Sequence, residues 1–431
     1  MTGWRQLPGR RVGVWGVGVE GLATLRRLAA DGIEPAAVVD RTEGVAPDGT
    51  AVLALDRGGA EALSRCEVVI KSPGISPYDA PAGALRTAGV ELVGGLGLWL
   101  ADAPEGRVLA VTGTKGKSTT SSIAGALIDG LGHSCLVGGN LGTPPWDPDT
   151  PPADWYVIEV SSYQAVDVRR GPSVVAVTSL SQDHLVWHHG YPGYVRDKLS
   201  LATRPGVQTV LIPAGDAELE AHRTLLGDHL VRVPADRPDW TAGLGLIGDH
   251  NLRNALLARA AIVALGVPGA TDDAAVAAAA LGYRPLRSRL TPLGEVAGVR
   301  FVDDSLSTNV LPTVAAVAAF PGEPVALLVG GEDRGIDYAP LWLALAGRTE
   351  PLLVLTLPDS GPRIAATLAR VAPTVAVRQC PDLPAAVREG FAWARPRGVV
   401  LLSPAAPSFG RFRDYAERAD VFEAAMAELR P

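Results

Sequence analysis

The sequence predicts an α/β fold built from three consecutive units of strands and helices, and three observations support it. The 431 residues are enough for about three domains of ordinary size. Short apolar runs alternate with segments of helical spacing along the chain, which is the pattern of parallel sheets covered by helices. Two of these runs lead into glycine-rich turns that open a helix, at residues 16–21 and 113–118.

The first predicted unit starts with a strand at 12–15, a turn at 16–21 and a helix that reaches Ala30. A second strand, 36–39, is followed by Asp40. Two further apolar runs, in which we expect strands, span 68–76 and 90–100. A polar break at 101–106 closes the unit.

The second and third units repeat the alternation. In the second unit a strand from Val108 enters GTKGKSTT and a helix to about Leu131; two more strands are expected at 155–162 and 173–181, and helices at 252–265 and 272–281. Residues 282–289 are expected to form a linker. The third unit has expected strands near 299–302, 325–329, 352–355, 375–377 and 399–402, and a last helix at about 414–429.

Composition excludes several classes of protein. The formal net charge is −7, and acidic and basic residues are interspersed, so the basic surplus that binds nucleic acid is missing. The three cysteines, Cys66, Cys135 and Cys380, fit neither a disulfide framework nor a zinc pattern. There is no signal-peptide pattern and no apolar run of about 18 residues. The sequence therefore predicts a cytoplasmic protein without a membrane or nucleic-acid partner.

The first glycine-rich turn is GVGVEG, residues 16–21, with Asp40 about 20 residues further on. Glycines allow a tight turn and a close backbone approach, and the helix N-terminus offers N–H groups to a pyrophosphate. An ordinary tight turn of an α/β domain is the alternative interpretation. The pattern leaves open which nucleotide would bind.

The second glycine-rich turn, GTKGKSTT, is a stronger signal for phosphate binding. Backbone N–H groups of such a loop surround phosphates, Lys117 can reach the terminal phosphates, and Ser118 can bind Mg²⁺. Only two residues separate Gly113 from Gly116, fewer than in the general phosphate-binding loop. Lysine occurs at only four positions in the chain, 71, 115, 117 and 198, and two of them lie in this loop.

Eight motifs follow one another over essentially the whole chain: GTKGKST from Gly113, GGNLGTP (138–144), EVSSYQ (159–164), SQDHL (181–185), DKL around Lys198, GDHNLRNA (248–255), DDSLSTN (303–309) and LLSPAAPSFGRF (401–412). In this order and approximate spacing they resemble the Mur ligase family, and most closely its glutamate-adding (MurD) type.

The resemblance implies three domains: a Rossmann-like domain at 1–104 that binds the UDP part of UDP-N-acetylmuramoyl-L-alanine, a central P-loop ATPase-like domain with a parallel sheet at 105–286, and a Rossmann-like domain at 287–431 that binds glutamate. It implies ATP-dependent ligation through an acyl phosphate in cytoplasmic peptidoglycan precursor synthesis, with two Mg²⁺ ions and a monomeric enzyme. Domain closure would exclude water from the acyl phosphate.

The catalytic and metal-binding residues have separate physical arguments. Glu159 ends a strand near the phosphate loop, and His184 follows the next strand, so both can face a metal ion. Lys198 lies in a segment of helical spacing, where a solvated lysine is the alternative. The resemblance implies that Lys198 is carbamylated and binds the second Mg²⁺, with Ser118, Glu159 and His184 as the other metal ligands and Lys117 as a catalytic residue.

The remaining site residues follow from the matching motifs. ATP is expected at Gly113, Thr114, Lys115, Gly116, Lys117, Ser118, Thr119, Asn251, Asn254, Arg289 and Asp304. The UDP-substrate is expected at Gly16, Val17, Gly18, Asp40, Arg41, Ser72, Pro73, Gly74, Asn140, Ser161 and Gln164. Glutamate is expected at Thr308, Arg334, Ser408, Phe409 and Tyr415.

The departures from the family pattern concentrate in the amino-acid pocket. Leu306 stands where the family has a lysine, and Arg334 corresponds best to a second lysine. Losing one cation weakens the binding of the same ligand in the same pose. The sequence therefore predicts glutamate as the amino acid and leaves both its D and L isomers open.

The motifs also allow four other interpretations, each with a feature against it. A nicotinamide-dependent oxidoreductase explains GVGVEG but not GTKGKST or Glu159. A non-catalytic nucleotide-binding scaffold could dispense with Lys117, Glu159 and Lys198. A folylpolyglutamate synthase is disfavoured by EVSSYQ and by the third unit. A zinc site at His184 and His188 has no third ligand at a suitable spacing.

Overall fold

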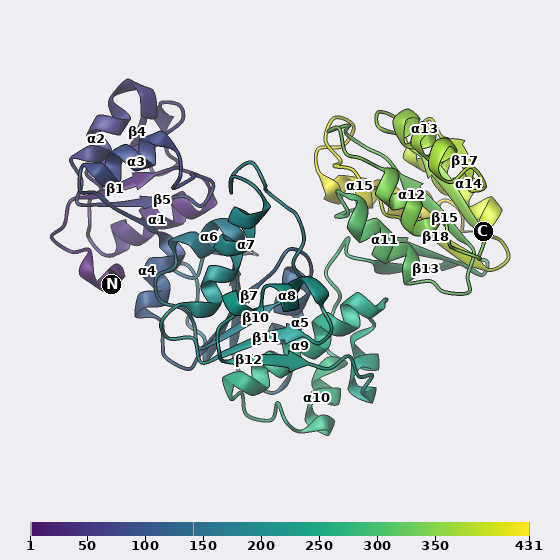
Figure 1. Cartoon of the computed structure of the whole chain (residues 1–431), viewed down its shortest axis with the longest axis horizontal. Helices are drawn as coiled ribbons and strands as arrows, with labels where there is room; N and C mark the ends of the chain where they lie inside the picture. Colours follow the sequence, from purple (N-terminus) through teal and green to yellow (C-terminus); the bar gives the residue numbers. More distant parts are fainter. Residues whose placement is uncertain (1, 141, 431) are drawn as a thin grey trace. The chain divides into compact units, whose positions relative to one another are not determined.

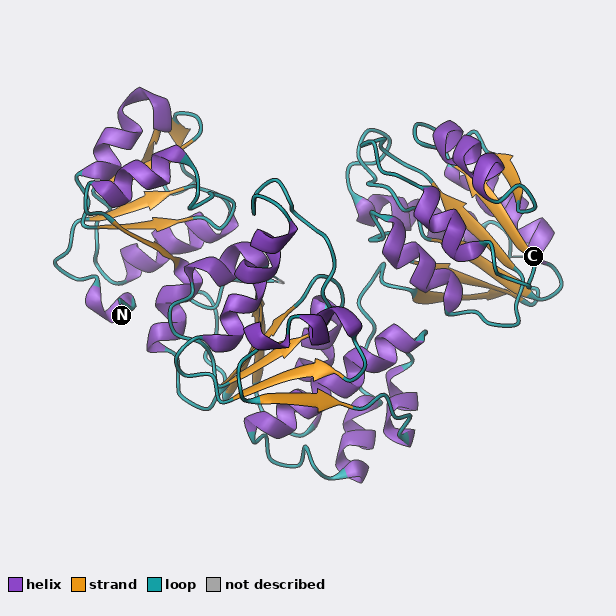
Figure 2. Ribbon diagram, viewed as in Figure 1, coloured by secondary structure: helices purple, strands orange, loops and turns teal. Residues whose placement is uncertain are grey.

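The structure, a computed structural model, describes residues 2–140 and 142–430; Met1, Pro431 and Leu141 of the GGNLGTP motif lie outside the described residues. Three six-stranded sheets follow one another along the chain, each with helices packed beside it (Figures 1 and 2). The predicted α/β fold class is therefore confirmed.

The first sheet has the strand order β3-β4-β2-β1-β5-β6 and is parallel except for the β3–β4 pair. Its central strand β1 is buried along its whole length, as expected for a sheet covered on both faces. The strands are β1 (Val12–Trp15), β2 (Ala37–Asp40), β3 (Gly44–Val45), β4 (Ala51–Ala54), β5 (Val68–Lys71) and β6 (Glu91–Gly94); the helices are α1 (Val19–Ala30), α2 (Ala60–Ser64), α3 (Ala80–Thr87) and α4 (Gly95–Asp102), with short turns η1 (Trp4–Gln6) and η2 (Leu55–Gly59).

The second sheet is parallel throughout, in the order β12-β11-β10-β7-β9-β8. Its strands are β7 (Val108–Thr112), β8 (Cys135–Gly139), β9 (Trp155–Glu159), β10 (Val174–Val177), β11 (Thr209–Pro213) and β12 (Leu230–Val233); its helices are α5 (Lys117–Gly130), α6 (Ser162–Asp167), α7 (Tyr191–Leu199), α8 (Ala217–Ala221), α9 (Asp249–Leu265) and α10 (Asp273–Ala280), with η3 (Ser200–Thr203), η4 (Arg223–Leu225) and η5 (Asp239–Leu244).

The third sheet has the order β13-β14-β18-β15-β16-β17, with only β13 antiparallel to its neighbour. Alternate residues of its strands enter two separate cores: Leu327 packs with α11–α13, and Leu328 packs with α14 and α15. The elements are β13 (Thr291–Val296), β14 (Val299–Asp303), β15 (Val325–Val329), β16 (Leu352–Thr356), β17 (Ala376–Gln379) and β18 (Gly398–Leu402), with α11 (Val310–Ala318), α12 (Ala339–Leu345), α13 (Gly361–Val371), α14 (Leu383–Ala394) and α15 (Tyr415–Ala427).

By internal contacts the chain divides into two compact units. The first comprises residues 1–244 and 253–283 and includes the first two sheets; the second comprises residues 245–252 and 284–431 and includes the third sheet. The predicted three-domain boundaries near residues 104 and 286 stay predictions.

The structure shortens four of the sequence-based strands: the runs 155–162 and 173–181 are strands only over Trp155–Glu159 and Val174–Val177, and two further runs end early as well. The run 90–100 is a strand only to Gly94, and Gly95–Asp102 form the short helix α4. The reason is that α4 is apolar on most sides, and periodicity cannot distinguish a short buried helix from a buried strand. The run 68–76 is a strand only to Lys71, and the residues after it form a loop.

Candidate active site

The phosphate loop between β7 and α5 is held by the end of β10. The Thr114 backbone N–H donates to Ser179 O at 2.8 Å, the Lys115 N–H donates to Ser179 Oγ at 2.9 Å, and the Thr178 hydroxyl donates to Lys115 O at 2.5 Å. These bonds satisfy the loop's own polar groups from the neighbouring strand. These bonds therefore define the conformation of the loop.

Gly116 brings two of the predicted ATP-binding elements together. Its φ is +92°, which favours glycine, and a Cβ there would lie 2.5 Å from the side-chain oxygen of Asn254 on α9. Both the backbone conformation and the close approach of Asn254 therefore require glycine. The helix α9 also carries Asn251, whose Nδ2 donates to Ile247 O at 2.9 Å.

Two lysine ammonium groups point at this loop. Lys117 Nζ donates to Gly113 O at 3.0 Å and to Thr114 O at 3.1 Å. Lys198 Nζ, from α7, donates to Gly113 O at 2.9 Å. The structure therefore brings together Lys117 and Lys198, which are 81 positions apart in the sequence.

Lys198 is 2% exposed. Burial lowers the pKa of its ammonium group well below the ordinary value, and the nearby Lys117 lowers it further, whereas Asp183 and Glu159 act in the opposite direction. Desolvation disfavours the charged form of an amine. The alternative of a solvated surface lysine is therefore wrong.

Glu159 stands at the end of β9 and is 2% exposed. Its Oε1 accepts a hydrogen bond from Asn140 Nδ2 at 2.6 Å, so two predicted site residues are in contact. Within the described part of the chain, its Oε2 is buried without a hydrogen-bond partner. A buried, unpartnered carboxylate oxygen fits a hard cation such as Mg²⁺. Ser118 is also predicted to bind Mg²⁺ through an oxygen. It is buried in the first turn of α5.

His184 and His188 have different environments. His184 is half-exposed, its φ is +50°, and its ring lies 4.9 Å from that of Tyr163. Burial of its ring lowers its pKa. His188 is buried and has its own hydrogen-bond partners. Among residues 2–140 and 142–430, no group of three or more His, Cys, Asp or Glu side chains could hold a metal ion by itself.

The first glycine-rich turn is held by Asp40. One carboxylate oxygen of Asp40 accepts from the Val17 N–H at 2.7 Å, and the other accepts from the Arg41 N–H at 2.6 Å. The Ser72 hydroxyl donates to Gly16 O at 3.1 Å. A Cβ at Gly21 would lie 1.8 Å from Gly16 O, so the turn requires glycine there. Asp40 therefore positions Val17 and Arg41, a role that its sequence spacing did not predict.

Gln164 makes two side-chain hydrogen bonds. Its Oε1 accepts from the Ser161 N–H at 2.8 Å, while its own N–H donates to Ser161 Oγ at 3.2 Å, in a capping box at the start of α6. Its Nε2 donates to Glu20 Oε1 at 2.6 Å. Glu20 lies near a buried ion pair between Lys71 and Asp167, with Nζ and Oδ2 2.5 Å apart. Sequence analysis missed Glu20, because its partner is 144 residues away.

Glu20 predicts a pH dependence of stability. Burial raises the pKa of its carboxyl from 4.5 to about 7, with Asp167 acting in the same direction and Gln164 and Lys71 opposing it. Between these values the folded chain retains a proton that the unfolded chain has lost, so stability falls as the pH rises from about 4.5 to 7. The Glu20→Gln variant escapes this loss and is expected to gain up to about 3 kcal/mol over wild type at pH 8.

Thermal unfolding of Glu20→Gln and wild type at pH 5 and pH 8 measures this effect. The difference in Tm should grow with pH. The exposed Glu34 supplies the control, since Glu34→Gln makes the same substitution on a side chain outside the buried site. A Glu20→Gln difference that is the same at pH 5 and pH 8 would contradict the assignment.

In the third sheet, Arg289 lies between two residues with left-handed backbone. Ser288 has φ +60° and Leu290 has φ +54°. The Ser288 hydroxyl donates to Asp303 at 2.8 Å, and the Leu290 N–H donates to Asp304 at 3.1 Å. Such backbone conformations in non-glycine residues persist when the surroundings enforce them, and they concentrate at functional sites.

Asp304 accepts further hydrogen bonds in this arrangement. Its second carboxylate oxygen accepts from the Ser403 hydroxyl at 2.8 Å and from the Ser307 hydroxyl. Burial raises the pKa of its carboxyl to about 7, although these hydrogen bonds oppose the rise. Asp304, predicted to bind ATP, therefore also fixes the segment that carries Arg289.

Two of the residues that are predicted to bind the substrate glutamate, Arg334 and Phe409, are in contact. The Arg334 guanidinium lies 5.7 Å from the centre of the Phe409 ring, and its Nε donates to Glu332 Oε2 at 2.7 Å. Phe409 and Tyr415 are exposed large side chains, Thr308 is exposed, and Ser408 is buried.

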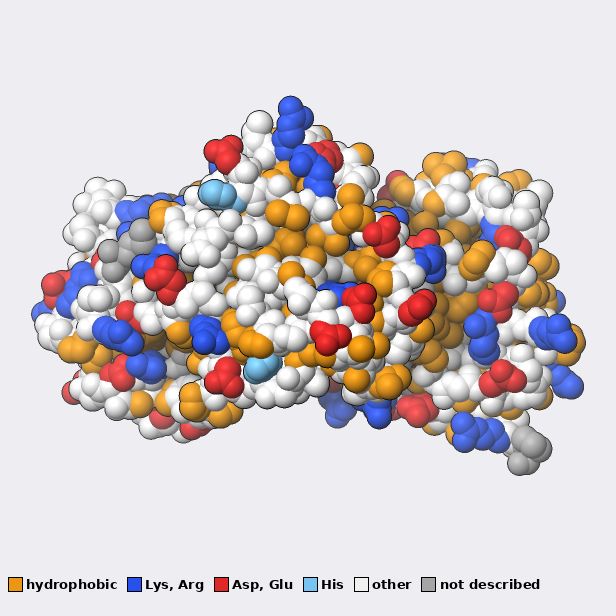
Figure 3. Space-filling model, turned by 90° about the horizontal axis from the view of Figure 1, so that it is seen from below, with side chains coloured by type: hydrophobic (Ala, Val, Ile, Leu, Met, Phe, Trp, Pro, Cys, Tyr) orange, Lys and Arg blue, Asp and Glu red, His pale blue; other side chains and the backbone are white. Residues whose placement is uncertain are grey.

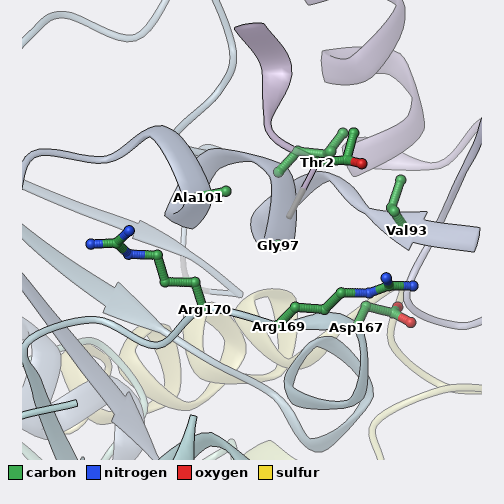
Figure 4. A pocket seen from close by; sticks show the side chains of 8 residues that line it. Thr2, Val93, Gly97, Ala101, Asp167, Arg169 and Arg170 are labelled. Carbon is green, nitrogen blue, oxygen red and sulfur yellow. The ribbon is translucent and has the colours of Figure 1, made fainter. Parts of the chain in front are cut away.

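An open cleft of about 230 Å³ lies elsewhere in the first compact unit. Figure 4 shows Arg169 extending toward Asp167 while Arg170 extends to the other side. The cleft is lined by Thr2, Val93, Gly97, Leu98, Ala101, Asp167, Arg169 and Arg170, none of which is a predicted site residue.

The surface is mixed in charge. On the face drawn in Figure 3, acidic and basic side chains are interspersed, in keeping with the net charge of −7. Over the residues described, no helix is long and apolar enough to cross a lipid bilayer.

A phosphate loop, a buried carboxylate and a buried lysine on a parallel sheet define an enzyme that handles nucleotide phosphates. Residues 111–233 match the sequence profile of the Mur ligase middle domain. The UDP-N-acetylmuramoyl-L-alanine--L-glutamate ligase of a Micromonospora species is 40% identical over 98% of this chain and 97% of that protein. The protein of the same name from Salinispora tropica is 39% identical over 98% of each chain. The chain therefore belongs to the Mur ligase family, and it is an ATP-dependent ligase.

Solved structures agree on the fold. The MurF of Acinetobacter baumannii has a TM-score of 0.59, with 16% identity over 100% of this chain and 92% of that one. Family membership excludes the oxidoreductase and the non-catalytic scaffold that the sequence had left as alternatives.

Proposed function

We propose that the enzyme joins glutamate to the alanine carboxyl group of UDP-N-acetylmuramoyl-L-alanine with consumption of ATP, as a step of peptidoglycan precursor synthesis. The names of the relatives that match nearly the whole chain support this substrate pair. The structural observation that carries the proposal is the buried, unpartnered Glu159 Oε2, which lies near the ammonium group of Lys198 beside the phosphate loop.

The reaction has two steps in this proposal. A carboxylate oxygen of the alanine attacks the γ-phosphorus of ATP, the bond to the bridging oxygen breaks, and ADP leaves, which gives an acyl phosphate. The glutamate amine then attacks the acyl carbon, loses a proton, and phosphate departs. Activation is needed because an unmodified carboxylate is a poor acylating agent.

The residues of this chain supply charge and orientation for these steps. Lys117 opposes the negative charge that develops on the transferring phosphoryl group, and the backbone N–H groups of the loop orient the phosphates. Asn254 lies against Gly116 and is proposed to orient the nucleotide. Arg289, whose neighbours Ser288 and Leu290 donate hydrogen bonds to Asp303 and Asp304, is proposed to contact the ATP phosphates.

The proposed ligands of two Mg²⁺ ions are Ser118, Glu159, His184 and a carbamate on Lys198. Mg²⁺ would neutralise phosphate charge there and favour transfer. The carbamate forms when the neutral Lys198 amine attacks the carbon of CO₂ and releases one proton. The lowered pKa of Lys198 supports this modification, because only the unprotonated amine is a nucleophile.

The proposed UDP-substrate residues lie in the same compact unit as these groups, on the turn at 16–18, at Asp40 and Arg41, and on the loop at 72–74, with Asn140, Ser161 and Gln164. The enzyme is proposed to act as a cytoplasmic monomer.

We propose L-glutamate as the amino acid, in preference to the D isomer. Leu306 removes one of the two cations expected for the D-glutamate pocket, which a rearranged pocket would explain. The relatives' names, which specify L-glutamate, support the same choice. Phosphate release with UDP-N-acetylmuramoyl-L-alanine and a panel of D- and L-amino acids tests it. Turnover with D-glutamate alone would contradict the proposed L isomer. Turnover with neither isomer would contradict glutamate as the amino-acid substrate.

Arg334 is proposed to bind a carboxylate of the substrate glutamate. The Arg334→Ala variant loses a charge-assisted hydrogen bond to a glutamate carboxylate, and its KM for glutamate should rise roughly 10- to 100-fold while ATP binding is unchanged. Arg378 is the matched control, because Arg334 and Arg378 are each 54% exposed and each forms an ion pair with a glutamate side chain of the protein. Equal effects of Arg334→Ala and Arg378→Ala on the KM would contradict the role.

A further inference from the structure

Three buried polar side chains, Asp197, His188 and Ser162, and the exposed Tyr78 form one hydrogen-bonded chain in the first compact unit, which we call the His188 network. The Tyr78 hydroxyl donates to Asp197 Oδ1 at 2.7 Å. His188 Nδ1 lies 2.8 Å from Asp197 Oδ2, and His188 Nε2 lies 2.9 Å from Ser162 Oγ. A carboxylate only accepts hydrogen bonds, so His188 Nδ1 donates to Asp197.

The members of the network come from four different segments. Tyr78 follows β5, His188 lies in the loop after β10, Asp197 is on α7, and Ser162 is the first residue of α6. Tyr78 and Asp197 are separated by 119 positions in the sequence. Asp197, His188 and Ser162 are 4%, 1% and 2% exposed. A fully hydrogen-bonded polar network at such burial favours one relative arrangement of the segments that it joins.

Each of these segments also carries residues of the proposed active site. Tyr78 ends the loop that contains Ser72, Pro73 and Gly74. His188 lies four residues after His184. Asp197 precedes Lys198, and Ser162 follows Ser161.

A second contact joins the same two loops. The Trp187 indole N–H donates to Gly74 O at 3.1 Å, and the Tyr78 ring lies 5.9 Å from the Trp187 ring and 5.5 Å from the His189 ring. The loop at 72–78 is therefore held against the loop at 184–190 by the His188 network and by neighbouring hydrogen-bond and ring contacts.

Ser162, His188 and Asp197 also have the hydroxyl, imidazole and carboxylate order of a nucleophilic triad. Burial argues against that role, because a substrate could not reach an Oγ on a residue that is 2% exposed. The arrangement instead suits a structural connection between loops.

We propose that Tyr78, Asp197 and His188 are positioning residues that hold the UDP-substrate loop at 72–78 against the segments bearing His184 and Lys198. The inference rests on the proposed function for the identity of the substrate. The network fixes where the substrate's alanine end meets the phosphate loop, so its loss weakens productive binding of the UDP-substrate more than binding of ATP.

Tyr78→Phe is the first test variant, because it removes the hydroxyl and keeps the ring. Its KM for UDP-N-acetylmuramoyl-L-alanine should rise about tenfold or more, as expected for losing a hydrogen bond to a charged group, with the KM for ATP unchanged. The matched control is Tyr191→Phe. Tyr191 also donates to a carboxylate, Glu218 Oε1 at 2.5 Å, but lies outside the network. Equal KM values for Tyr78→Phe and Tyr191→Phe would overturn the proposal.

Two substitutions of His188 separate its two bonds. In His188→Asn the side-chain N–H can replace Nδ1 toward Asp197, whereas His188→Gln can replace only the contact with Ser162. We expect His188→Asn to stay within about threefold of the wild-type KM for the UDP-substrate and His188→Gln to resemble Tyr78→Phe. The reverse order would overturn the proposal. Ser162→Ala should retain kcat, and its inactivation in a folded protein would favour the nucleophile instead.

Amide hydrogen exchange tests the network without turnover. Tyr78→Phe should speed exchange in peptides covering residues 72–78 and 184–190, and Tyr191→Phe should leave the 72–78 peptide unchanged. If wild-type enzyme releases no phosphate with any amino acid, the proposed function is wrong, and the exchange measurement still decides the network. Unchanged exchange in both peptides of Tyr78→Phe would overturn the network.

Discussion

Lys117→Met is expected to lower kcat for ATP-dependent ligation by roughly 10²- to 10³-fold or more, because it removes a preorganised cation from the transferring phosphoryl group. Lys117 Nζ donates to Gly113 O and Thr114 O, so the loop itself holds the ammonium group in place. Methionine preserves the length of the side chain and most of its packing. The measurement is phosphate release at saturating ATP, with nucleotide binding and Tm recorded for the same protein.

The control for Lys117→Met is a cation in the same compact unit but outside the site. Arg65 is an exposed residue directly after α2 that pairs with Glu61, so Arg65→Met should keep wild-type kcat. Near-normal turnover of Lys117→Met would refute the role of the phosphate loop. Loss of turnover with an equal loss of folded protein would attribute the effect to stability.

The phosphate loop could be predicted from sequence because its chemistry is local. Gly113, Gly116 and Lys117 lie within five residues, and the apolar strand before them has a clear boundary. The buried strands of the sheets were predictable for the same reason. The ends of the strands were harder to predict, because α4 is apolar enough to resemble a continuation of β6.

Most of what holds the candidate site together could not be predicted, because it depends on contacts between distant residues. Sequence patterns indicated Asp40 and Gln164 as substrate residues, but not that Asp40 accepts from Val17 or that Gln164 donates to Glu20. His188 drew attention only as a possible zinc ligand. Its bonds to Asp197 and Ser162 follow from packing α6 and α7 together, which no local pattern specifies.

Lys198 leads to the second prediction of large effect. Both Lys198→Arg and Lys198→Ala should lower kcat by about 10²-fold or more, because neither can form the carbamate that would supply an anionic oxygen ligand. Arginine keeps a positive charge, so its failure distinguishes a carbamate from a simple cation. Wild-type enzyme exposed to ¹³CO₂ should show a carbamate signal in NMR that Lys198→Arg lacks.

Chemical rescue tests whether the missing group at Lys198 is an anion. A short-chain carboxylate such as formate can enter the space left in Lys198→Ala and supply an oxygen, so it should restore part of the activity. Lys117→Ala is the matched control, because it removes a lysine that donates to the same carbonyl, Gly113 O, but that is needed as a cation. A carboxylate should therefore not restore Lys117→Ala. Because Lys198 is buried and its pKa is lowered, its neutral amine is the only one of the two proposed to react with CO₂. Full activity of Lys198→Arg, or equal rescue of the two alanine variants, would show that Lys198 acts without a carbamate.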